Sequence, residues 1–310
     1  MSPSNSSNPS GMSPGTRLTI RVIIAIVACL ALLLPLSAGT SNFFQRVNTK
    51  ESTETSALPA DMSKLEVDAE RARVQISTTP SPTGSATLEF RGTSSTVPQI
   101  SLDTSGGITR VGVTGLDSRP FLDRDELRLN IEIPEAQARE MDVTSTSKFS
   151  HTVISGEYRR LVASTTTGMI EADVTAQALQ LRATSGAIDV TGSAATVALE
   201  TKVGAISSTE LNVSEKLTAS TSTGALDLRL GQKTVPTAGI EVSVNSGAVD
   251  LRVPRIDSVE DTEATGYRVD ASTSSGASDV GIDEVPSGTE EPFVPITVRS
   301  DSGFVDIQYL

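Results

Sequence analysis

Residues 179–192 have the sequence LQLRATSGAIDVTG, and this stretch carries the pattern that determines the fold. Apolar or small residues occupy every second position on each side of Gly186, as is typical of strands with one buried face. These positions are Leu179, Leu181, Ala183, Ile188 and Val190. The alternation changes phase at the glycine, which requires a corner that glycine tolerates best. The unit is therefore predicted to be a strand, a glycine corner and a second strand.

The same unit recurs seven times. Its glycines are Gly168, Gly186, Gly204, Gly224, Gly247, Gly276 and Gly303, spaced 18, 18, 20, 23, 29 and 27 residues apart. One unit cannot bury its apolar face alone, whereas stacked units share a continuous core. We therefore predict an all-β domain over residues 61–310, a parallel β-solenoid of short Gly-centred strand repeats, with seven or eight coils in 141–310 and the most regular pattern from residue 161. An antiparallel β-sandwich is the alternative, but it does not explain a repeated glycine-centred unit.

The repeat weakens towards the N-terminus. Residues 141–153 keep the alternation but place Lys148 where the glycine belongs, and residues 61–140 are predicted to form less regular coils at the entry end, with one turn at 134–140. The longer insertions before Gly247, Gly276 and Gly303 are expected to be loops on one side of the solenoid.

Composition excludes several classes of function. One His and one Cys cannot build a His/Cys metal cage or a disulfide framework. With no Trp and only 3 Tyr, few side chains are available to stack on bases or sugars. All 38 acidic residues lie after residue 50, together with 21 of the 25 basic ones, so this part carries a net charge of −17. Nucleic-acid binding is therefore not expected.

The N-terminal 60 residues predict a membrane anchor. Residues 1–16 are rich in Ser, Pro, Asn and Gly and are expected to be a disordered cytoplasmic tail. The 18 uncharged residues from Val22 to Gly39 follow Arg17 and Arg21, which predicts a transmembrane helix over 17–39 with the N-terminus inside. The alternatives are a cleaved signal peptide and a lipoprotein whose lipidated residue is Cys29. Residues 40–60 are predicted to be a polar linker.

Two short segments carry a resemblance to a known family. TSGAIDV at residues 184–190 and IEIPE at residues 131–135 resemble the bacterial DUF4097 family, the adhesin-like or toast-rack β-repeat proteins of the cell envelope. The resemblance covers residues 61–310 and is strongest from residue 161. It implies an envelope β-repeat domain, often tethered to the membrane and sometimes linked to envelope stress, and it brings no catalytic residues.

An acidic column is the most conspicuous polar feature. The third residue after the glycine is acidic in six units, namely Glu171, Asp189, Asp227, Asp250, Asp279 and Asp306. Stacked coils would align these side chains, which suggests either a Ca²⁺ site or, as we favour, a solvated face that discourages sheet association. His151 occupies the same position in the Lys148 unit and is expected to be solvated. Ser145 and Lys148 have the spacing of a nucleophile pair, but residues three apart in a strand face opposite sides.

The leading hypothesis is a non-enzymatic, membrane-tethered, extracytoplasmic module for adhesion, scaffolding or envelope sensing. It assigns no catalytic, cofactor-binding or metal-binding residues and no cofactor. Its expected partners are the membrane, through the N-terminal helix, and an unidentified envelope protein or surface ligand. The alternatives are an exported carbohydrate-active enzyme on the same scaffold, which would use paired carboxylates, and a filament that assembles through its terminal coils.

Overall fold

The structure, a computed structural model, describes residues 50–92, 96–116, 125–259, 262–286, 288, 290 and 292–310. These residues are almost entirely β-structure, which confirms the all-β class. Their helical segments are the single turn α2 (Glu135–Ala138), where a turn was predicted, and the 3-10 turn η1 (Ile256–Ser258). None of the helices in this part of the chain is long and apolar enough to cross a bilayer. The predicted tail and membrane helix, residues 1–39, lie outside the described residues.

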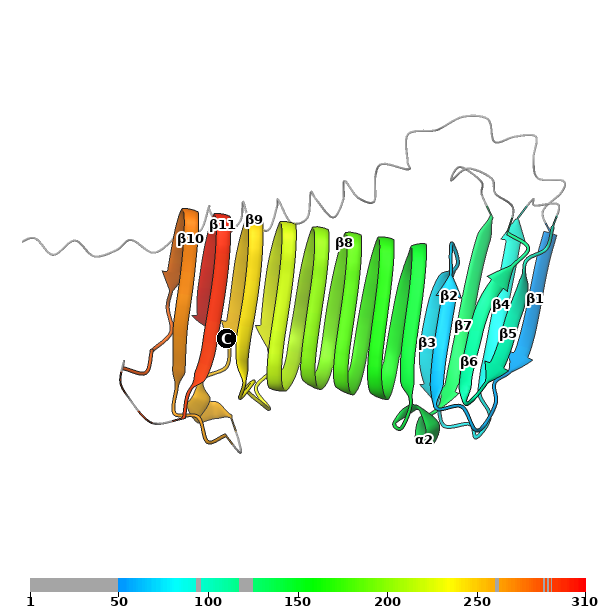
Figure 1. Cartoon of the computed structure of the whole chain (residues 1–310), viewed down its shortest axis with the longest axis horizontal. Coiled ribbons are helices and arrows are strands. Elements are labelled where there is room, and N and C mark those ends of the chain that lie inside the picture. Colours follow the sequence, from blue (N-terminus) through cyan, green and yellow to red (C-terminus); the bar gives the residue numbers. More distant parts are fainter. Residues whose placement is uncertain are drawn as a thin grey trace, which may run out of the picture. The chain divides into compact units, whose positions relative to one another are not determined.

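Parallel coils make up the C-terminal half of the chain, from Asp142 onwards. Strand β8 (Asp142–Leu230) winds through successive coils, as the repeated loops of ribbon in Figure 1 show. Strands β9 (Gly239–Val253), β11 (Val294–Tyr309) and β10 (Tyr267–Val280) continue the ladder in parallel register. The register aligns equivalent positions of the repeat, so that Gly224 pairs with Gly247 and Leu226 with Val249. The antiparallel sandwich is therefore wrong for this part of the chain.

Each corner glycine packs directly on the backbone of the neighbouring coil. Gly224 has a φ of 150°, and a Cβ placed on it would lie 1.6 Å from the carbonyl oxygen of Gly204. Gly186 and Gly204 show the same approach, with separations of 1.7 Å each. No side chain fits at such a distance, so glycine is required here both for its backbone angle and for its missing Cβ.

The core lies between the two strand segments of each coil. Its side chains come from the alternate positions of the repeat and include Leu179, Leu181, Ile188, Val190, Leu226, Leu228, Val249, Leu251, Val305 and Ile307, each no more than 2% exposed. Burial of one such side chain contributes roughly 1.5–3 kcal/mol. Because every coil adds several of them to the same stack, no single coil is stable without its neighbours.

The coil before Gly168 has a different register from the predicted one. Ser150, not Lys148, takes the glycine position, because a Cβ on Gly168 would meet the carbonyl oxygen of Ser150. The spacing of 18 residues is thus retained, and Val143 and Ser147 fill inward positions. The prediction placed the corner at Lys148 because a shift of two residues keeps the same alternation of buried and exposed positions.

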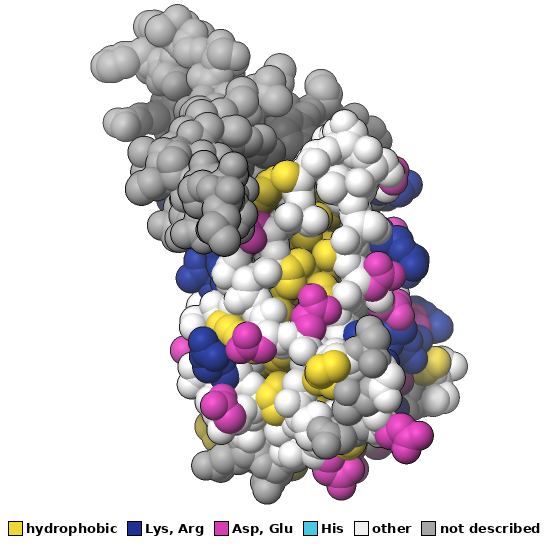
Figure 2. All heavy atoms as spheres, turned by 90° about the vertical axis from the view of Figure 1, so that its left-hand side faces the viewer, with side chains coloured by type: hydrophobic (Ala, Val, Ile, Leu, Met, Phe, Trp, Pro, Cys, Tyr) yellow, Lys and Arg dark blue, Asp and Glu magenta, His cyan; other side chains and the backbone are white. Residues whose placement is uncertain are grey.

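The order of strands at the C-terminal end differs from their order in the chain. Strand β11 pairs with β9 on one side and β10 on the other, so the last strand of the chain lies inside the stack. Strand β10 is the terminal coil, and its inward residues Val269, Ala271 and Val280 are only partly buried. Figure 2, viewed onto this end, shows hydrophobic side chains along its middle with charged groups at the sides.

The other end shows a similar inversion. Strands β2 (Lys64–Ala69) and β3 (Arg73–Thr79) pair in parallel with β8, and on their other side with β6 (Ile108–Thr114) and β7 (Glu126–Pro134). A coil that comes early in the chain is therefore inserted between two later ones. This agrees with the prediction that residues 61–140 extend the same sheet system.

Antiparallel strands close this end of the sheet. Strand β5 (Gln99–Ser105) pairs with β6, strand β4 (Ser85–Gly92) with β7, and strand β1 (Lys50–Ala57) with β4. Strand β1 lies within residues 40–60, the predicted linker, so β-structure begins no later than Lys50. Its polar sequence, KESTETSA, gives no apolar alternation, because an edge strand here buries little.

The glycine contacts lead to a stability prediction. Substitution Gly224→Ala is expected to lower the free energy of unfolding by roughly 3 kcal/mol or more, because the new Cβ forces two coils apart. Gly106→Ala is the control: it also has a positive φ, 60°, but nothing lies within 4 Å of the added Cβ. That change is expected to cost about 1 kcal/mol. Denaturant unfolding of both variants compares them, and equal losses would show that coil contact is not the cause.

Candidate functional site

The acidic residues form one column along the coils. The pairing of β8, β9, β11 and β10 places Asp227, Asp250, Asp306 and Asp279 next to one another in that order. Glu171 and Asp189 have the same offset from their corner glycines, and Ser207 interrupts the column between Asp189 and Asp227. Stacking of the predicted residues is thus confirmed, although Asp306 precedes Asp279 in space.

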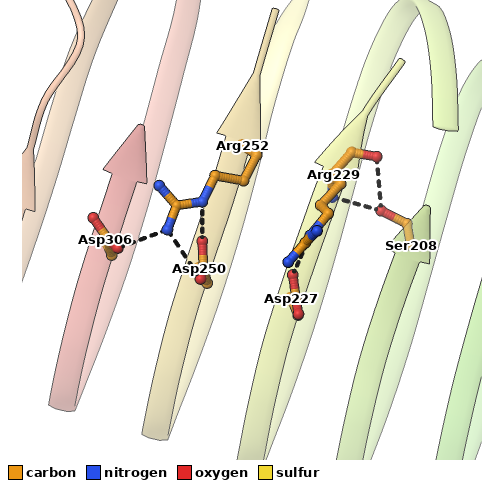
Figure 3. A network of polar contacts seen from close by, with 6 residues as sticks. All are labelled: Ser208, Asp227, Arg229, Asp250, Arg252 and Asp306. Atoms are coloured by element: carbon orange, nitrogen blue, oxygen red, sulfur yellow. Dashed lines mark hydrogen bonds and ion pairs between the residues drawn. The ribbon is translucent and has the colours of Figure 1, made fainter. Parts of the chain in front are cut away.

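An arginine, rather than solvent, neutralises the centre of this column. Arg252 Nε lies 2.8 Å from Asp250 Oδ1, and Arg252 Nη2 lies 3.0 Å from Asp306 Oδ2. Figure 3 shows the guanidinium reaching across from β9 to the carboxylate on β11. Asp306 is only 6% exposed and also accepts a hydrogen bond from Gln308 Nε2 at 3.0 Å. The prediction of a solvated face is wrong at this position, because the long side chain two residues further on folds back over the acids.

The neighbouring coil repeats the motif more loosely. Arg229 Nε lies 3.5 Å from Asp227 Oδ1, and the side chain of Arg229 is 46% exposed, compared with 21% for Arg252, whereas the two aspartates are about equally exposed. The backbone of Arg229 is fixed by Ser208, whose hydroxyl accepts from the amide of Arg229 at 3.0 Å and donates to its carbonyl at 3.3 Å (Figure 3). The D-x-R spacing shared by residues 227–229 and 250–252 was visible in the sequence, and it was the signal for this network that our sequence analysis missed.

Burial changes the acidity of two members of the column. Burial raises the pKa of Asp250 above its ordinary value, Arg252 opposes the rise, and Asp227 adds to it. Burial also raises the pKa of Asp189, helped by the charge of Glu171 and opposed by a hydrogen bond from Ser207. The ionised carboxylate therefore costs folding free energy at both positions, and at Asp250 the ion pair with Arg252 offsets only part of the effect of burial.

The structure provides no support for a cation site in this column. No group of three or more His, Cys, Asp or Glu side chains within the described ranges is arranged to hold a metal ion. Between Asp250 and Asp306, the guanidinium of Arg252 already supplies the positive charge that a calcium ion would bring.

The other predicted polar residues do not assemble into a site. Ser145 is 1% exposed, whereas the ammonium of Lys148 pairs with Glu70 on the outside, so the two side chains face opposite ways as expected. His151 has a partner after all, because its Nε2 lies 3.0 Å from Glu171 Oε1. His151 follows Ser150 directly and so lies two positions away from the acidic column, not in it.

A groove lies at the opposite turn of the coils from the glycines. It has a volume of about 1110 Å³, and its walls come from three parts of the chain. They are the end of one coil in β8 (Thr209, Glu210, Asn212 and Ser214), the connection 231–237, and Ser258, Val259 and Thr262 at and after the end of η1. The last two belong to the insertions that were predicted to be loops on one side, and the third insertion lies close to the second, since Val294 N donates to Gly266 O at 3.0 Å. The groove was not predictable from the sequence, because its walls are far apart in the chain.

The family follows from the sequence together with this fold. The family model described as Toastrack DUF4097 matches residues 101–285, which is more than half of the chain. The chain belongs to the Toastrack DUF4097 family. The resemblance inferred from residues 131–135 and 184–190 is thus confirmed. The matched residues include the glycine corners from Gly168 to Gly276 and also Arg252.

Three solved structures are similar to the chain at low sequence identity, and the first of them shares its fold. A "putative adhesin" from Parabacteroides merdae is 12% identical, with a TM-score of 0.51, covering 83% of this Toastrack chain and 96% of its own. A "putative adhesin" from Bacteroides fragilis is 14% identical, with a TM-score of 0.43 and coverage of 84% and 97%. A "putative lipid binding protein" from Parabacteroides distasonis is 8% identical, with a TM-score of 0.38 and coverage of 86% and 98%. No curated protein matches the chain.

The two arginines make a matched pair for mutation. Arg252→Gln is expected to lower the free energy of unfolding by about 2 kcal/mol, because it leaves the buried carboxylate of Asp306 without its cation. Arg229→Gln, which removes a more exposed pair, is expected to cost no more than about 0.5 kcal/mol. Denaturant unfolding of both variants measures the difference. Equal losses would mean that Arg252 stabilises the coils through its packing alone.

The acidic column also predicts a pH dependence. Because the folded pKa of Asp189 is raised, its ionised form destabilises the fold above that pKa, and the penalty disappears when both states are protonated at lower pH. Asp189→Asn is therefore expected to raise the melting temperature at pH 7 by about 1–2 °C, with a gain that vanishes as the pH falls towards 3.8. Asp173→Asn serves as the control, because it removes the same charge from an exposed side chain, two residues after Glu171 in β8. A gain for Asp189→Asn that is constant with pH would contradict the assignment.

Proposed function

We propose that this Toastrack protein is a non-enzymatic, adhesin-like interaction module that is tethered to the cell membrane and faces the extracytoplasmic side. The observation that supports this most directly is the parallel register of the coils, which repeats equivalent side chains along one rigid ladder. Such a ladder can present a long surface to a partner without any conformational change. The partner class is an envelope protein or a surface ligand.

The polar network favours binding over catalysis. A carboxylate pair that cleaves glycosidic bonds needs one acid that gives up its proton to substrate and one that faces the reacting carbon. Here Asp250 and Asp306 share the guanidinium of Arg252, and Asp306 is buried. Acids held in this way stabilise coil stacking and are poorly placed to reach a substrate.

The N-terminal sequence supports the tether. An 18-residue apolar stretch, preceded by two arginines, has the length and flanking charge of a single-pass helix with its N-terminus inside. In this arrangement, residues 40–310 are outside the cell membrane, and the acidic domain is repelled by anionic lipid head groups rather than lying flat on them.

Labelling of a new thiol in intact cells tests the proposed location. Ser222 is exposed beside the Gly224 corner, so Ser222→Cys is expected to react with a membrane-impermeant maleimide at full-length mass in the membrane fraction. The parent protein controls for Cys29, which is expected to be shielded in the bilayer, and Ser4→Cys should react only after lysis. Reaction of Ser222→Cys only after lysis would place the β-domain in the cytoplasm and refute the proposed function.

A further inference from the structure

The backbone of Glu210 is strained at the rim of the groove. Its φ of 54° makes it the one non-glycine residue with positive φ in the described part of the chain. The equivalent residue one coil earlier is Gly192, 18 positions before, which also has a positive φ. A left-handed conformation costs a residue with a Cβ about 1–2 kcal/mol, and such strain is commonly stored where a side chain has a role. A glutamate therefore stands where a glycine would fold more easily.

One amide fixes Glu210 relative to a lysine across the groove. Asn212 Nδ2 donates to the carbonyl oxygen of Glu210 at 3.0 Å, and Asn212 Oδ1 accepts from the backbone amide of Lys233 at 3.0 Å. The connection that carries Lys233 is held further by Gly231 N, which donates to Leu211 O at 2.9 Å. Both residues thus have a fixed backbone before any ligand arrives, which lowers the entropy lost on binding.

The charged groups of these two residues are free. Within the described residues, neither the carboxylate of Glu210 nor the ammonium of Lys233 has an ion pair or hydrogen bond, in contrast to the paired Arg182, Lys216, Arg229 and Arg252. Both line the same groove. Two opposite charges that do not pair with each other leave room for a ligand that carries the complementary charges.

The other residues that line the groove indicate which class of ligand fits it. Leu230, Val235 and Val259 supply buried apolar surface beside the hydroxyls of Thr209 and Thr262. None of the described residues that line the groove is aromatic, so they offer no stacking platform of the kind that sugars usually require. A groove of about 1110 Å³ accommodates a few residues of an extended chain.

We propose that this groove binds a short extended peptide segment that carries one basic and one acidic side chain. The basic group pairs with Glu210, the acidic group pairs with Lys233, and small apolar residues between them cover Val235 and Val259. The strain at Glu210 is then retained because a glycine there would lose the carboxylate. This proposal names the ligand class of the proposed interaction module and rests on that function.

Binding of blocked tetrapeptides to the purified full chain tests the proposal. The probes are acetyl-Lys-Ala-Ala-Glu-amide, the same peptide with Lys and Glu exchanged, and the two peptides with Lys or Glu at both ends. One of the mixed-charge peptides is expected to bind in the millimolar range or tighter by isothermal titration, and the like-charged ones at least about tenfold more weakly. Equal binding of all four, or of none at millimolar concentration, would overturn the proposal.

Variants connect binding to the two residues. Glu210→Gln and Lys233→Gln are each expected to weaken the preferred peptide about tenfold, whereas Lys216→Gln, which removes the same charge outside the groove, leaves it unchanged. The double variant Glu210→Lys with Lys233→Glu is expected to prefer the peptide of opposite order. Glu210→Gly is expected to abolish peptide binding and to raise the melting temperature. This result would show that the strained backbone of Glu210 is not needed for folding. Unchanged affinity in both single variants would refute the site.

The two proposals fail independently. Peptide binding by the purified chain does not depend on membrane orientation, so cytoplasmic labelling of Ser222→Cys would refute the location and leave the groove result intact. Outward labelling without peptide binding would refute only the groove.

Discussion

Close approach of one backbone to the next at the glycine corner is the constraint on which the rest of the structure depends. At this corner the carbonyl of one coil lies where the Cβ of the next would be, and the separation of 1.6–1.7 Å recurs from Gly186 to Gly276. Such contact sets the position of each coil along the ladder and fixes which residues align. The core columns, the acidic column and the Arg252 bridge all follow from that alignment, because each combines side chains from successive coils at the same offset from the glycine.

Much of this was predictable from local sequence, since alternation, phase change and glycine all act within a single unit. The order of the final coils was not. Strands β9, β10 and β11 carry the same pattern, so nothing within a unit specifies that β11 pairs with β9. In retrospect, three inward positions of β10 hold the small or polar residues Ala271, Thr273 and Ser278, as suits a coil with no neighbour on one side. The register at Ser150 was not predictable for a related reason: a shift of two residues leaves the alternation of buried and exposed positions unchanged.

The polar residues, too, are only partly predictable from a single unit of the sequence. An acid between two buried positions is correctly expected to point outwards, but its exposure depends on the side chains of neighbouring columns. Burial raises the pKa of both Asp250 and Asp189, but Arg252 bridges Asp250 to Asp306 and opposes the rise, whereas none of the described cationic side chains pairs with Asp189 beside Glu171. The position of a residue within its unit thus predicts whether its side chain points outwards. Only the three-dimensional register shows whether an opposite charge lies beside it.

The two turns of each coil have different freedom, and this difference locates the groove. At the glycine corner, insertion of a residue would break the stack, so variation in the glycine spacing has to be absorbed elsewhere. Those of the extra residues that the structure describes lie at the opposite turn, in 231–238, 254–259, 262–266, 281–286 and 292–293, where backbone hydrogen bonds join them to adjacent loops and coils. Glu210 belongs to this permissive turn, and its left-handed backbone is tolerated there because Asn212 and the 231–237 connection hold it. A scaffold that is rigid at one turn can therefore carry a differently shaped surface at the other without loss of its core.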